Sequence, residues 1–101
     1  MDTKKLVADM KARFEHNSAK HYLKEKYSSK LCTVEQGGYW KADINTISFL
    51  NSIKSKNVVI LDLYDVPVSV EVKKLKEKLS DVYNTVMTEW HDEYKELENK
   101  R

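Results

Sequence analysis

The sequence predicts an α+β fold, built as a single small domain over residues 1–101. The chain has 41% apolar and 34% charged residues, which is typical of a globular protein with one hydrophobic core. Apolar residues recur at helical spacing toward both ends, whereas short β-prone runs occupy the middle. Two glycines and one proline are the only strong breakers, so we expect long elements and short connections. The expected order is α-α-β-β-α-β-β-α, with two short hairpins and a long C-terminal amphipathic helix.

The N-terminal region is expected to form two helical segments joined by a bend. Thr3 suits the cap of the first segment. Its apolar residues at helical spacing are Leu6, Val7, Met10 and Phe14. The pattern weakens over residues 16–18, where Asn17 or Ser18 can cap a second segment with Tyr22, Leu23 and Tyr27 on its apolar side. One bent helix is the alternative, because Asn and Ser are tolerated inside helices.

The first hairpin is expected around Gly37 and Gly38. β-prone residues over 30–36 and 39–42 flank this pair, and a two-residue type I′ turn needs positive φ at both central positions. Trp40, beside a short strand, is expected in the core rather than in a stacking site. Cys32 is the only cysteine, so we expect a small buried apolar residue and no internal disulfide.

A short helix is expected after Asp43, which is well placed as its N-cap. Phe49 lies beside the apolar face of this helix. That face is formed by Ile44, Ile47, Leu50 and Ile53.

The run Val58–Tyr64 is predicted to be the central strand. Its apolar residues follow one another almost without a break, which is typical of a strand covered on both faces. The alternating residues Val66, Val68 and Val70 predict the last strand. Pro67 lacks an amide donor, so this strand should lie at an edge or begin after the proline.

The last helix is expected from about Glu71 to the end. Its apolar stripe comprises Val72, Leu75, Leu79, Val82, Tyr83, Val86, Met87, Trp90, Tyr94 and Leu97. A helix of about 28 residues is about 42 Å long, whereas a compact domain of this size is about 30 Å across, so part of the helix should extend past the core. We expect Leu75, Leu79, Val82 and Val86 in the core, and the stripe beyond them on a contact surface.

Charge divides this helix. Residues 69–80 hold four lysines and two glutamates, whereas residues 81–99 hold six acids and one lysine. This polarity opposes the helix dipole. An antiparallel copy of the helix would compensate it, and so would the basic N-terminal region; the alternative is that both are solvated faces.

No catalytic, metal or phosphate-binding signature is present in the sequence. His16 and His21 lie five residues apart, which does not align two ligands on a helix, and Gly37-Gly38 lacks the lysine of a phosphate-binding loop. Asp62 and Asp65 occupy a strand end, where catalytic carboxylates occur, but turn formation and amide capping explain them better. We therefore expect no enzyme activity, cofactor, metal or small-molecule substrate.

The chain is expected to act as a non-enzymatic protein–protein interaction module, as an accessory or regulatory subunit or a homodimer. The predicted partner-binding residues are Trp90, Tyr94, Leu97, Glu89 and Glu93. The alternative is a nucleic-acid-binding accessory protein, against which stands a net charge of only +2. The residues for that alternative are Lys11, Arg13, Lys20 and Lys24.

The sequence also bears on location and source. No apolar stretch approaches the roughly 20 residues of a membrane span, and the N-terminus lacks an apolar signal core, so a cytoplasmic protein without membrane contact is expected. Lysine strongly outnumbers arginine, which is typical of AT-rich coding sequence in a low-GC bacterium or a large phage.

Overall fold

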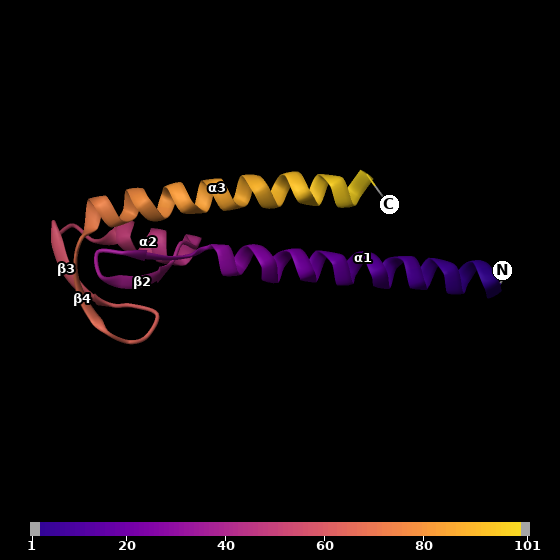
Figure 1. The fold of residues 1–101 in the computed structure, drawn as a ribbon, viewed down its shortest axis with the longest axis horizontal. Coiled ribbons are helices and arrows are strands. Elements are labelled where there is room, and N and C mark those ends of the chain that lie inside the picture. The colour runs from indigo at the N-terminus through magenta and orange to yellow at the C-terminus, as the bar shows by residue number, and fades with distance from the viewer. Residues whose placement is uncertain (1–2, 100–101) are drawn as a thin grey trace.

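The computed structural model describes the backbone of residues 3–99 and, within the first helix, the side chains of residues 10 and 11 and from 15 onward. Two long antiparallel helices lie side by side, and a head of short strands joins them at one end (Figure 1). The elements in chain order are α1 (Thr3–Lys30), β1 (Cys32–Glu35), β2 (Gly38–Lys41), α2 (Ile44–Ser52), β3 (Asn57–Leu61), β4 (Pro67–Glu71) and α3 (Val72–Asn99).

The α+β class and the long C-terminal helix are confirmed, but the molecule is more elongated than expected. It measures 64 × 24 × 21 Å with a radius of gyration of 19.2 Å. A compact domain of 100 residues has a radius of gyration of about 13 Å. The part that extends past its neighbour is the start of α1, whereas the end of α3 lies alongside α1 (Figure 1).

The N-terminal region is one helix, so the predicted division into two segments is wrong. α1 runs from Thr3 to Lys30 without interruption through Asn17 and Ser18. Both residue types are accommodated inside helices when tertiary contacts favour continuation. Here Leu23 and Tyr27 are buried in the core, so packing holds the second half of α1 in place.

The first hairpin is confirmed, but its turn lies one residue earlier than predicted. Gln36 and Gly37 take the positive φ angles of 50° and 81°, and Gly38 pairs with Glu35 as the first residue of β2. Gly38 is needed for packing instead, because a Cβ there would lie 2.6 Å from Cζ2 of Trp40. Trp40 is 3% exposed and its Nε1 donates to the Glu35 carbonyl at 2.8 Å, which confirms its place in the core.

The prediction of a central strand over Val58–Tyr64 is wrong. β3 ends at Leu61 and pairs with β4 alone, in a separate two-stranded antiparallel sheet. Its side chains alternate, with Val58 and Ile60 partly buried and Val59 and Leu61 more than 60% exposed. A continuous apolar run has the same appearance whether one face or both are covered, and here only one is.

β4 begins at Pro67 itself and, within residues 3–99, is one of only two strands in its sheet, so the predicted edge position is confirmed and the alternative start after the proline is wrong. Asp43 caps α2 by accepting from the Thr46 amide at 2.8 Å, which confirms its predicted role. Cys32 is exposed on β1 and not buried, contrary to expectation, because it lies on the outward face of that strand.

The core lies between α2, α3, β2, β4 and the end of α1. Leu75 and Leu79 are fully buried and Val86 is 6% exposed, while Val82 packs against them, which confirms the predicted core part of α3. Within residues 3–99, no helix has the length and apolar character needed to cross a membrane.

Candidate functional site

The turn between β3 and β4 is built around the Asp62 carboxylate. Asp62 Oδ1 accepts from the backbone N–H groups of Tyr64 (2.9 Å) and Val66 (3.0 Å), and Oδ2 accepts from that of Tyr39 on β2 (3.1 Å). The Leu63 amide also donates to the Tyr39 carbonyl at 2.9 Å. These bonds fix the turn internally and tie it to the neighbouring hairpin.

Asp62 is 9% exposed, and its environment favours the charged carboxylate. Burial alone would raise its pKa, but the three backbone N–H donors outweigh burial and lower it. This confirms the amide-capping role that the sequence favours for Asp62. Asp65 lies at the tip of the turn with φ of 60°, a left-handed conformation in which aspartate is enriched.

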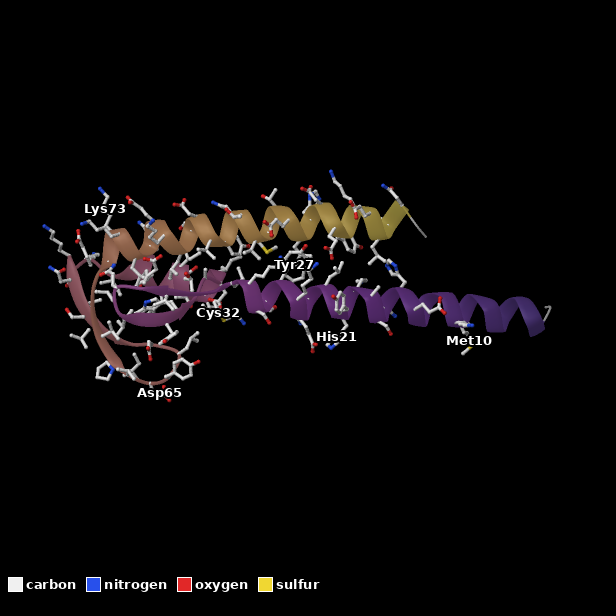
Figure 2. The ribbon with its side chains drawn as sticks, in the orientation of Figure 1. Met10, His21, Tyr27, Cys32, Asp65 and Lys73 are labelled. Atoms are coloured by element: carbon white, nitrogen blue, oxygen red, sulfur yellow. The ribbon has the colours of Figure 1, made fainter. Side chains whose placement is uncertain are left out.

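This hydrogen-bonded turn exposes apolar side chains. Leu63 and Val66 are each 50% exposed, and Tyr64 is 71% exposed. The Tyr64 ring meets the Tyr39 ring edge-on, with centroids 5.1 Å apart. The turn swings out from the head on the side away from the helices, as the label on Asp65 in Figure 2 shows. We call the exposed set the head patch: Tyr39, Leu61, Leu63, Tyr64 and Val66.

A groove of about 490 Å³ adjoins the head patch, between α2 and the edges of β2 and β3. Its apolar lining includes Phe49, Leu61 and Leu63, each at least 50% exposed. Its charged residues are Asp62, which is already satisfied by backbone donors, and Lys41. In the part of the chain that the structure describes, no ion pair or hydrogen bond engages the Lys41 side chain. The groove is therefore an open apolar surface with one unpaired positive charge.

The strand edges differ in how they are protected. The side-chain amide of Gln36 covers one end of the outer edge of β4. It donates to the Glu71 carbonyl and accepts from the Glu71 N–H. Pro67, at the other end of β4, has no N–H to offer at the same edge. The bond from the Asp62 N–H to the Val66 carbonyl sets the alternation of the ladder, so the backbone groups of Leu61 point away from β4. Exposed apolar strand edges that lack such protection can pair with other chains, and the edge of β3 at Leu61 borders the groove.

The predicted partner-binding residues on α3 lie against α1. Trp90 is half-buried and stacks on Tyr27, with ring centroids 5.9 Å apart and an interplanar angle of 11°. Glu93 accepts from Lys26 Nζ at 2.8 Å and from the Tyr27 hydroxyl at 3.0 Å. The remaining predicted residues also lie near the seam, the line of contact between α1 and α3. Glu89 pairs with Lys30 at 3.6 Å, and Tyr94 and Leu97 pack against the core. Partner binding by these residues stays a prediction, since the structure shows only their contacts within the chain.

The same contacts bring the acidic end of α3 to the basic α1. The hydrogen bond from Lys26 lowers the pKa of Glu93, and that bond raises the pKa of Lys26. The pKa of Tyr27 is raised mainly by burial and, to a smaller extent, by its hydrogen bond to Glu93. Of the two predicted ways to compensate the charge of the last helix, pairing with the N-terminal region is the one that these ion pairs provide.

The residues of the nucleic-acid alternative are spread along α1. Lys11, Lys20 and Lys24 are exposed, and the side chain of Arg13 lies outside the described residues, as do those of Leu6, Val7 and Phe14. Within the described side chains, no group of three or more His, Cys, Asp or Glu residues is placed to hold a metal ion.

Comparison with protein-family models, with curated proteins and with solved structures gives no match for this chain. The site therefore rests on its own geometry. Sequence reasoning missed the head patch because it assigned Leu61, Leu63 and Tyr64 to a covered strand. The available signal was the pair of aspartates at positions 62 and 65, since aspartate is a turn residue and its side chain binds amides two residues on.

Proposed function

We propose that the protein is a non-enzymatic protein–protein interaction module that binds through the head patch. The observation that carries this proposal is the turn at Asp62, which exposes Leu63, Tyr64 and Val66. Three backbone N–H groups donate to the Asp62 carboxylate and hold the turn in one shape. Exposed apolar groups that are held rigidly lose little conformational entropy on binding. Tyrosine is also one of the residue types enriched at interface hot spots.

The proposal keeps the functional class expected from the sequence and moves the surface from α3 to the head. Trp90 and Glu93 already contact α1, so using them for a partner would break contacts within the chain. The head patch requires no such exchange. Its apolar side chains, together with Phe49 in the adjoining groove, form an open apolar surface.

Site-specific photo-crosslinking tests the proposal. A photoreactive phenylalanine analogue replaces Tyr64 in one variant and Tyr22 in a control, because Tyr22 is a similarly exposed tyrosine (64%) on α1, outside the head. Each variant is irradiated in an extract of cells that express the protein. We expect a discrete crosslinked protein product from position 64 and none from position 22. Equal products from both positions, or none from position 64, would contradict the proposal.

A further inference from the structure

We infer that the occupant of the head patch is a second copy of this chain, placed by a two-fold axis so that each turn tip enters the other's groove. The inference rests on the proposed function and names its partner. It follows from two neighbouring features of the head: a protruding tip that carries the carboxylate of Asp65, and an open groove that carries the ammonium of Lys41, both unpaired among the residues that the structure describes.

The tip consists of Tyr64, Asp65 and Val66. All three residues are exposed, and Figure 2 shows Asp65 at the outer limit of the turn. The tip thus presents two apolar side chains on either side of one negative charge. Within residues 3–99, no ion pair or hydrogen bond of the Asp65 side chain satisfies that charge.

The groove has the opposite character. Its walls are apolar, and its one charge without a partner among the described residues is the ammonium of Lys41. A Tyr64 side chain seated against Phe49 and Leu61 of another copy would bring the adjacent Asp65 to the rim that carries Lys41. Charge complementarity of this kind fixes register and suppresses wrong partners.

Two-fold symmetry makes the arrangement reciprocal. In an isologous interface the same patch is used on both copies, so every contact occurs twice. Because Leu63 of the groove directly precedes Tyr64 of the tip, the two features lie side by side on one head, and a single axis allows both tips to enter both grooves. Each dimer would then contain two ion pairs between Asp65 of one protomer and Lys41 of its partner. In Figure 1 the turn between β3 and β4 lies below the head, whereas the long helices run to the right of it.

Charge reversal tests this arrangement through mixing. Lys41→Glu alone places two acids opposite each other at both contacts, and Asp65→Lys alone places two lysines there. An equimolar mixture of the two variants restores two attractive pairs in the mixed dimer, one of them reversed. We expect each variant alone to self-associate at least about tenfold more weakly than the unmodified protein. The equimolar mixture should recover most of that loss.

The measurement is the solution mass by sedimentation, over protein concentrations up to about 1 mM. This range detects self-association with a dissociation constant of up to about 1 mM. Lys73→Glu, an exposed charge reversal at the start of α3, is the matched control and should leave association unchanged. Thermal unfolding of each variant confirms that it is folded, which matters for Asp65→Lys because of the positive φ at that position.

A constant mass of 11.9 kDa at every concentration would overturn the second copy as occupant, and so would a dimer that both single variants leave unchanged. Neither result decides the proposed function, which depends on the photo-crosslinking at position 64. A crosslinked product of twice the chain mass supports both inferences. A product of any other mass supports the proposed function and overturns the second copy.

Discussion

Trp90→Ala separates the surface role predicted from the sequence from the structural role seen at the seam between the helices. Truncating a fully buried tryptophan costs about 3–5 kcal/mol of unfolding free energy. Trp90 is half-buried, so we expect about half of that loss, with about 0.5–1.5 kcal/mol more from its stacking on Tyr27. The expected total is about 2–4 kcal/mol, a large part of the stability of a typical small domain, which is about 5–15 kcal/mol.

Urea unfolding followed by far-ultraviolet circular dichroism measures this loss. With a slope of about 1–3 kcal/mol per molar urea, a loss of this size should lower the midpoint by about 0.7–4 M. Trp90→Phe keeps an aromatic ring opposite Tyr27 and should lose less than half as much. An unchanged midpoint for Trp90→Ala, together with weakened association, would refute the seam role and restore Trp90 as a surface anchor.

Three further predictions concern the head and the seam. Gly38→Ala should destabilise the fold by about 1–3 kcal/mol and expose the indole to water, because the added methyl group collides with Trp40; a red-shifted tryptophan emission checks this. The folded-state pKa of Glu93 is lowered, so its contribution to stability is present above the ordinary glutamate pKa and is lost as the pH falls through the lowered value. The thermal midpoint of Glu93→Gln should therefore fall less between pH 7 and pH 3 than that of the unmodified protein; an equal fall would contradict the ion pair. Asp62→Ala removes both acceptor oxygens, which leaves the N–H groups of Tyr64, Val66 and Tyr39 without their acceptor and should lower both the thermal midpoint and the binding through Tyr64; unchanged values for both would refute the role of the carboxylate.

Much of the fold followed from local sequence signals. The stripe from Leu75 to Val86 has helical spacing over many turns, and Asp43 has the side chain and position of an N-cap, so both could be recognised without a structure. The first hairpin needed positive φ angles, and glycine indicated its place to within one residue. In each case the deciding interaction lies within a few residues of the signal.

The remaining features depend on contacts between distant parts of the chain. The apolar run from Val58 is compatible with one covered face or two, and the choice depends on which elements pack against it. Tyr27 and Trp90 are far apart in sequence, and nothing local indicates that they stack. The head patch was hidden for the same reason, because the exposure of Tyr64 depends on the Asp62 carboxylate reaching the amide of a residue in another hairpin.

Amide hydrogen exchange in the free protein tests the central claim most directly, since that claim is a rigid turn with exposed apolar side chains. The N–H groups of Tyr64 and Val66 both donate to Asp62. We expect their exchange to be slower than in an unstructured peptide of the same sequence, and Asp62→Ala, which removes the acceptor oxygen that both share, to remove part of that protection. Exchange at the unstructured rate in the unmodified protein would show that the turn has no fixed shape, and would contradict a preorganised binding surface on the head.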